Sequence, residues 1–267
     1  MRTGNEQSDK KRRQWAGYSD RQVDKIDQIY KENLTCQLVR QAIVNAVRDA
    51  GFSSGNLLDV GCGTGEVAIA MHDKGFNVTG LDISPAMLKR FEEQKGDREI
   101  TLLSGDVFDL PGEEIFDVAT CRYVFSHYEN FSSFLSHIAK HVKSKGVIVF
   151  DSFSSEPLKH NAAKVGITKG PFGRRVYSNL AHFSGDELSA ACDTLGLRVE
   201  RRFPAAFFHR NPWFAFSYPA IEEYDAELEV HLNDPGVKKF MNWFHARITP
   251  TMDSFQAGNL VNVLRKI

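Results

Sequence analysis

The 267-residue sequence lacks a charge excess of either sign. It holds 33 Lys and Arg residues against 34 Asp and Glu residues, which gives a formal net charge of -1. Proteins that bind nucleic acid or anionic membranes through their overall field carry a marked positive excess. The composition therefore predicts no nucleic-acid partner. A local basic patch is the one feature that the net charge would not reveal.

Cysteine is scarce and dispersed. The four residues Cys36, Cys62, Cys121 and Cys192 show no Cys-x-x-Cys spacing. That spacing is typical of zinc sites and redox motifs, so the sequence indicates neither a metal centre nor a disulfide framework. Dispersed thiols suit a reducing compartment, and we expect a cytoplasmic protein.

Long apolar runs are also missing. Residues 1–14 are polar and contain no apolar stretch that would form a signal peptide, so we expect a disordered tail there. No later run approaches the ~20 apolar residues that a membrane-spanning helix needs. The sequence predicts no membrane insertion, and its length suits one large α/β domain.

Glycine, by contrast, is concentrated at one informative place. A short apolar run that contains Asp59 precedes Gly61, Gly63 and Gly65, and residues 66–71 then have the pattern of a helix. The segment predicts a strand, a tight turn and a helix start. Backbone N–H groups in such a turn can face a ligand, because glycine has no side chain to hold the ligand off. The spacing differs from the Gly-x-Gly-x-x-Gly of dinucleotide-binding folds.

Two acids stand at the ends of the next two predicted strands. Asp82 ends residues 76–82, and Asp106 follows residues 100–105. A carboxylate at the first position can accept hydrogen bonds from both hydroxyls of a ribose. A carboxylate at the second position can accept a hydrogen bond from an adenine amino group.

At these residues the chain resembles the class I S-adenosylmethionine-dependent methyltransferases. Asp59 and the three glycines match the first motif of that family, Asp82 matches the second, and Gly105-Asp106-Val107 matches the third. The resemblance covers roughly residues 56–151. It implies a methyltransferase with S-adenosyl-L-methionine as its cofactor. It also implies a Rossmann-like α/β sheet of seven strands, six parallel and one antiparallel closing strand.

Two predicted helices precede the glycine turn. The first begins at the capping-box-like residues 19–22, and the second covers residues 34–49. In the family such helices often cover the cofactor cleft. Tyr18 and Tyr30 are therefore candidates to close over the methionine end of the cofactor or over the substrate. The equal alternative is that both tyrosines only pack in the core. The residues assigned to the cofactor are Tyr18, Asp59, Gly61, Cys62, Gly63, Gly65, Asp82, Ile83, Met87, Gly105, Asp106, Val107, Cys121 and Arg122.

Aromatic residues gather after the sixth predicted strand. We expect the core to comprise residues 15–203 and 259–267, with residues 204–258 inserted before the closing strand as a helical, aromatic cap. Trp213 and Phe216 are the candidates in this cap for contact with the acceptor. A homodimer interface would use the same aromatic residues and is the alternative interpretation.

Histidine supplies the candidates for a general base. The cofactor carries the reactive methyl group, so the protein needs a base only where an acceptor such as an alcohol must lose a proton. The reference pKa of histidine, about 6.5, suits that role. His127, which follows the fourth predicted strand beside the substrate candidate Tyr123, is the first choice, and His182 and His209 are the alternatives. A solvent-exposed helix start is the other interpretation of His127. Three further histidines are expected at the surface of covering helices: His72, His137 and His141.

Two absent motifs bear on the acceptor. The segment after the fourth predicted strand lacks the Asn/Asp-Pro-Pro-Tyr motif of enzymes that methylate nucleic-acid bases, and no paired-glutamate hairpin like that of protein arginine methyltransferases stands out. The chain is similar to the type 11 branch that modifies quinones such as ubiquinone and menaquinone, sugars and secondary metabolites. This similarity implies methyl transfer to a hydroxyl or amine of a small molecule, although fold alone does not fix substrate.

Two other functions use the same cofactor residues. A non-catalytic S-adenosylmethionine-binding regulator would need the cofactor site without turnover. An aminopropyltransferase-like enzyme normally carries an acid just after the fourth strand, where this chain has Arg122 and Tyr123. A nicotinamide oxidoreductase is disfavoured by the glycine spacing and by Asp106.

Overall fold

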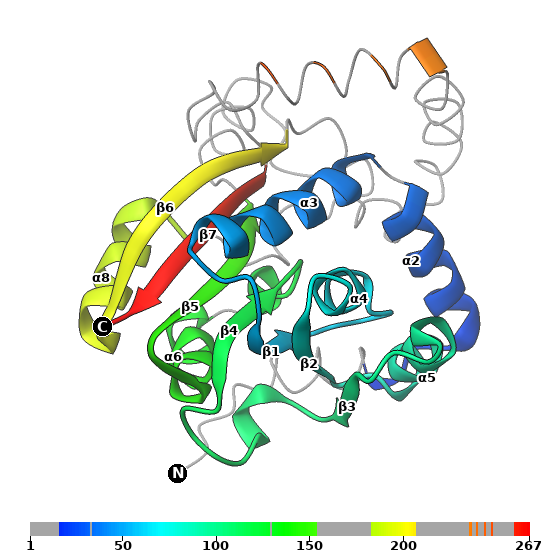
Figure 1. The fold of residues 1–267 in the computed structure, drawn as a ribbon, viewed down its shortest axis with the longest axis horizontal. Helices are drawn as coiled ribbons and strands as arrows, with labels where there is room; N and C mark the ends of the chain where they lie inside the picture. Colours follow the sequence, from blue (N-terminus) through cyan, green and yellow to red (C-terminus); the bar gives the residue numbers. More distant parts are fainter. Residues whose placement is uncertain are drawn as a thin grey trace, which may run out of the picture.

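A seven-stranded sheet forms the centre of the molecule (Figure 1). The structure is a computed structural model, and it describes residues 16–32, 34–128, 130–153, 183–206, 235–236, 239, 243, 247 and 259–267. The spatial order of the strands is β3-β2-β1-β4-β5-β7-β6. The strands are β1 (Gly55–Val60), β2 (Phe76–Asp82), β3 (Thr101–Ser104), β4 (Phe116–Cys121), β5 (Val142–Phe153), β6 (Leu197–Ala206) and β7 (Asn259–Lys266).

Strand direction confirms the predicted sheet. The strands β1 to β5 pair in parallel wherever they are neighbours. The closing strand β7 lies between β5 and β6 and is antiparallel to both, which makes it the one reversed strand. Since the carboxyl ends of parallel strands meet at one edge, the turns after β1, β2, β3 and β4 gather there, where α/β sheets bind their ligands.

Helices cover both faces of the sheet (Figure 1). In β1 the consecutive residues Leu57 and Leu58 are fully buried in two different apolar clusters, one on each face. The first cluster includes residues of α3 and α4, and the second includes residues of α6 and α8. The helices are α2 (Asp20–Glu32), α3 (Leu34–Asp49), α4 (Glu66–His72), α5 (Pro85–Lys95), α6 (Phe131–His141) and α8 (Gly185–Leu195), with the 3-10 turns η1 (Val107–Asp109) and η2 (Phe125–His127).

Helix starts follow the capping signals in the sequence. At the start of α2, Ser19 Oγ accepts from Gln22 N and Gln22 Oε1 accepts from Ser19 N, which is the predicted capping box. Ser84 caps α5, whose first residue is Pro85. A second full capping box opens α8. These caps fix where the helices leave the strand ends, and hence the shape of the edge that carries the site.

Two local expectations were wrong. The sixth strand is predicted from the sequence to span residues 197–203, but β6 runs to Ala206, because it lies at the edge of the sheet, where a bulge at residues 204–206 accommodates Pro204. His141, expected at the surface, is only 3% exposed, since it lies at the end of α6 among buried residues. Burial lowers the pKa of His141 and keeps its ring neutral.

Several expectations fall outside the described residues. These are the disordered tail, nearly all of the aromatic cap, and the individual residues His182, His209, Trp213 and Phe216. Within the described residues, the four cysteines are buried and form no disulfide bond. None of the helices described there combines the length and the apolar character that crossing a membrane would require.

Candidate active site

A cavity that opens to solvent lies at the carboxyl ends of the parallel strands. Ligands of α/β sheets bind at this edge. The turns after β1, β2, β3 and β4 contribute to its wall, and residues on and beside α2 close it. The lining residues are Tyr18, Tyr30, Asp59, Val60, Gly61, Cys62, Gly63, Val67, Leu81, Asp82, Ile83, Ser84, Met87, Gly105, Asp106, Val107, Arg122, Tyr123, Val124, His127 and Tyr128.

The glycine turn is shaped by close packing on two sides. Gly61 has a φ of 67°, and a Cβ atom there would lie 2.3 Å from Val124 Cγ2. Gly65 has a φ of 94°, and a Cβ atom there would lie 2.2 Å from the ring of Phe91 in α5. Only glycine combines this backbone with these contacts. Gly61 therefore lets the turn after β1 pack directly against the turn after β4, whereas Gly65 packs against α5.

Asp82 is tied to the glycine turn by its own carboxylate. Oδ2 accepts a hydrogen bond from Gly63 N at 2.8 Å, and Oδ1 accepts one from Ser84 N at 2.8 Å. Burial raises the pKa of Asp82, and these backbone donors counteract part of that effect. Burial, together with the charge of Asp82, raises the pKa of Tyr18 to about 12, so the Tyr18 hydroxyl stays protonated near neutral pH.

Two further acids face the same cavity. Asp59 accepts a hydrogen bond from Thr120 Oγ1 at 2.8 Å, and burial raises the pKa of Asp59 to about 7. Asp106 Oδ1 accepts from Phe108 N at 3.1 Å, and Asp106 Oδ2 accepts from Tyr128 Oη at 3.3 Å. A cavity with three carboxyl groups favours a ligand that brings positive charge.

Arg122 is the one Lys or Arg side chain in the described lining of this cavity. Its side chain is 8% exposed, and Nη2 donates to Glu66 Oε2 at 3.0 Å. The guanidinium lies 4.6 Å from the ring centroid of Tyr30 and 5.5 Å from that of Tyr123. Burial by itself would lower the pKa of Arg122, but Glu66 together with Tyr30, Cys36 and Tyr123 outweighs it and the pKa is raised, so this side chain stays cationic.

The turn after β4 carries the histidine candidate. His127 is half-buried at the end of η2 and lines the cavity, and its backbone N–H donates to Val124 O at 2.9 Å. The adjacent Tyr128 ring stacks on Phe134 of α6 with centroids 3.9 Å apart. This stacking fixes the chain just past His127 against a buried helix, so the imidazole stands at a defined place in the wall.

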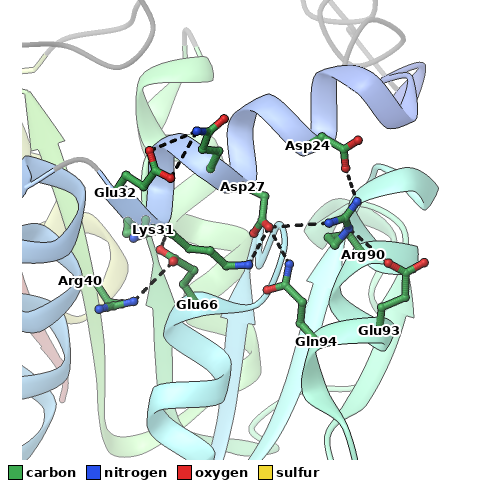
Figure 2. A network of polar contacts seen from close by, with 11 residues as sticks. Asp24, Asp27, Lys31, Glu32, Arg40, Glu66, Arg90, Glu93 and Gln94 are labelled. Carbon is green, nitrogen blue, oxygen red and sulfur yellow. Dashed lines mark hydrogen bonds and ion pairs between the residues drawn. The ribbon is translucent and has the colours of Figure 1, made fainter. Parts of the chain in front are cut away.

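The helix α2 is fastened to α5 by charged groups (Figure 2). Asp27 Oδ2 accepts from Lys31 Nζ at 2.7 Å and from Gln94 Nε2 at 2.8 Å, and Asp24 pairs with Arg90. Burial alone would raise the pKa of Asp27, but the bonds from Lys31 and Gln94 outweigh it and lower the pKa. These contacts hold α2, with Tyr30 in the helix and Tyr18 just before it, over the cavity.

The cavity brings together every residue predicted to bind the cofactor except Gly65 and Cys121. Gly65 packs against Phe91, and Cys121 is buried in the apolar cluster under α6. The substrate candidates Tyr123 and His127 are in the wall, and among the described residues no group of three His, Cys, Asp or Glu side chains is arranged to hold a metal. Sequence reasoning did not identify Val124, whose only sequence signal is its place just after the fourth strand.

Sequence comparison identifies the family. The profile of the methyltransferase domain family matches residues 30–201. Ubiquinone biosynthesis O-methyltransferases of Rickettsia typhi and Rickettsia conorii are 31% and 30% identical to the chain over 100 and 101 residues. Each match covers 37% of this chain, and it covers 41% and 35% of the two relatives, so the chain spans less than half of their length.

Solved structures share the fold. The magnesium protoporphyrin IX methyltransferase of Synechocystis PCC 6803, solved with bound SAH, aligns with a TM-score of 0.59 at 16% identity, over 91% of this chain and 94% of that one. A possible histamine N-methyltransferase of Thermotoga maritima aligns with a TM-score of 0.57 at 16% identity, over 93% and 98%. Together with the family match, the strand order and the motif residues around one cavity, these findings show that the chain belongs to the methyltransferase domain family and has the class I S-adenosylmethionine-dependent methyltransferase fold.

Proposed function

We propose that the protein transfers a methyl group from S-adenosylmethionine to a hydroxyl or amine of a small molecule. The observation that carries this proposal is the convergence of the glycine turn, Asp82 and Asp106 on one cavity. The two Asp82 oxygens each accept one backbone N–H. A carboxylate oxygen has two lone pairs, so each can still accept a ribose hydroxyl.

The remaining lining residues fit the other parts of the cofactor. Ile83 and Met87 offer apolar contact for an adenine ring, and Asp106 offers an acceptor for its amino group. The methionine end carries a carboxylate, an ammonium and a sulfonium. Arg122 would hold the carboxylate, and Asp59 would lie toward the positive groups. When bound, the cofactor supplies an electrophilic methyl group, and the protein contributes position and electrostatics.

His127 is the proposed general base for a hydroxyl acceptor. It lies in the turn after β4, in the cavity wall that also holds Arg122 and Tyr123. A neutral imidazole there can accept the hydroxyl proton as the oxygen attacks. An amine acceptor needs no such base once its free form is bound, so the role of His127 depends on the acceptor.

The names of the relatives favour an oxygen acceptor, and we propose a phenolic hydroxyl for this chain. The Rickettsia proteins are named as ubiquinone biosynthesis O-methyltransferases. We further propose that Trp213 and Phe216, which lie outside the described residues, belong to a cap that contacts this acceptor. The same aromatics in a homodimer interface are the alternative. A cytoplasmic location without a nucleic-acid partner is part of this proposal.

Label transfer tests the proposal. The full-length protein is incubated with S-adenosylmethionine labelled in the methyl group and with ortho-dihydroxyphenols, and the products are separated by chromatography. We expect label in a methylated phenol, and His127→Ala serves as the control that keeps the cofactor site intact. Tight binding of the cofactor without label transfer to phenols or to a metabolite extract would instead support the alternative function, a non-catalytic S-adenosylmethionine-binding regulator. An aminopropyltransferase would instead leave the methyl label in methylthioadenosine and none in the acceptor.

A further inference from the structure

The turn after β4 contains a buried residue in a rarely occupied backbone conformation. Tyr123 has a φ of 60° and is 2% exposed. A bulky side chain seldom adopts this left-handed region, and it does so where the surroundings hold it there. Such residues concentrate at functional sites, and this one lines the cavity.

The backbone of Tyr123 is hydrogen-bonded to the carboxylate of Asp151. Asp151 Oδ1 accepts a hydrogen bond from Tyr123 N at 2.6 Å. The contact joins the ends of two neighbouring strands, since Cys121 of β4 pairs with Phe150 of β5. Asp151 is itself 2% exposed, and burial raises its pKa to about 7 while the Tyr123 N–H counteracts part of that effect.

The residues on either side of Tyr123 are those on which the proposed function depends. The guanidinium of Arg122 lies against the Tyr123 ring and bonds Glu66. On the other side, Val124 packs where Gly61 has no side chain, and Val124 O accepts from His127 N. The backbone of Tyr123 therefore sets the positions of a cofactor group and of the candidate base together.

We infer that Asp151 is a positioning residue, whose carboxylate holds the left-handed Tyr123 turn and thereby places Arg122 and His127 in the cavity. The inference rests on the proposed function, because it is that function which assigns roles to Arg122 and His127. The side chain of Asp151 is absent from the lining of the cavity, so it acts through the turn.

Binding of S-adenosylhomocysteine measures this role without any acceptor. Asp151→Leu keeps the branched shape of the side chain, with larger methyl groups in place of the oxygens, but cannot accept a hydrogen bond, whereas Asp151→Asn keeps an acceptor oxygen. We expect calorimetry to show affinity reduced about tenfold or more in Asp151→Leu and by less than about threefold in Asp151→Asn. Ser152→Ala is the matched control: Ser152 is buried in the same strand and bonds Asn262 at 2.9 Å, so its loss affects stability and leaves affinity unchanged.

A double-mutant comparison separates positioning from general destabilisation. If Asp151 acts by placing Arg122, the effect of Asp151→Leu on affinity shrinks markedly in an Arg122→Ala background. Thermal unfolding verifies that each variant folds, and Asp151→Ala replaces Asp151→Leu if the leucine variant does not fold.

Three results would overturn the inference while the wild type still binds S-adenosylhomocysteine. These are wild-type affinity in Asp151→Leu, an equal loss in Asp151→Asn, and strict additivity with Arg122→Ala. Failure of the wild type to bind at all would overturn the proposed function, and the inference with it.

Discussion

The carboxylate of Asp82 accepts the backbone N–H of Gly63 at 2.8 Å, across 19 positions of sequence. The acid at the end of β2 thus holds the glycine turn that follows β1. In the proposed complex the same carboxylate also binds the ribose. A single side chain therefore shapes the site and contacts the ligand.

Replacing Asp82 should affect both roles. Asp82→Ala removes the acceptor for the ribose and releases Gly63, so affinity for S-adenosylhomocysteine should fall by about 5- to 150-fold, the equivalent of about 1–3 kcal/mol. Asp82→Asn retains one acceptor oxygen and should lose less. Calorimetric titration provides the comparison, and equal affinity in wild type and Asp82→Ala would place the ribose elsewhere.

His127→Ala should slow methyl transfer to a phenolic hydroxyl by about 10²–10⁴-fold, the usual effect of removing a general base. His127→Gln keeps hydrogen-bonding capacity but loses basicity, so it should be nearly as slow. Both variants should bind S-adenosylhomocysteine as the wild type does, and the acidic limb of the pH–rate profile should disappear. Near-normal turnover in both would remove His127 from the mechanism and direct attention to His182 and His209.

Cofactor binding should release protons near neutral pH. Burial raises the pKa of Asp59 to about 7, and a cationic ligand beside it would stabilise the carboxylate and lower that pKa. Affinity for S-adenosylmethionine should therefore rise as the pH increases toward 7. Titration at pH 6.5 in buffers of different ionisation enthalpy measures the proton count directly. Identical heats in all buffers would show that Asp59 does not change its protonation on binding.

The same carboxyl group should make stability depend on pH. The pKa of Asp59 is raised in the folded protein from its ordinary value of 3.8 to about 7, so its contribution to folding is fully present below pH 4 and is lost as the pH rises through 7. Asp59→Asn cannot ionise. Its melting temperature relative to wild type should increase between pH 5 and pH 8, at the expense of cofactor affinity. A difference independent of pH would mean that Asp59 is ionised at both values.

The attachment of α2 should control the release of cofactor. Asp27 is 5% exposed and bonds Lys31 and Gln94, so Asp27→Ala should increase the dissociation rate of S-adenosylhomocysteine about tenfold or more in stopped-flow measurements. Asp20→Ala is the matched control, because the Asp20–Lys89 pair is exposed and such pairs contribute little. Equal rates in wild type and Asp27→Ala would show that the cofactor leaves without movement of α2.

Much of the fold followed from local signals in the sequence. The turn after β1 is fixed by its glycines. The starts of α5 and α8 are fixed by Ser84 before Pro85 and by the capping box at Ser184, through contacts between residues close in sequence. The acids at the ends of β2 and β3 were identifiable because parallel strands bring their carboxyl ends to one edge. These features placed most of the predicted cofactor residues in one cavity.

Contacts between distant segments could not be obtained in this way. The bond from Tyr123 N to Asp151 depends on the pairing of β4 with β5, and the burial of His141 depends on how α6 meets its neighbours. Cys121 and Arg122 are adjacent in sequence, yet Cys121 faces the apolar cluster under α6 while Arg122 faces the cavity. At this point β4 ends and the chain turns, so the regular alternation of side chains between the two faces of the sheet no longer predicts where each side chain points.

A calorimetric titration of the wild-type protein with S-adenosylhomocysteine tests the central claim, that the cavity at the ends of β1, β2, β3 and β4 is a cofactor site. We predict saturable binding of one molecule per chain, competition by S-adenosylmethionine, and no competition by NAD. Absence of saturable heat, or binding of NAD in place of S-adenosylhomocysteine, would contradict it.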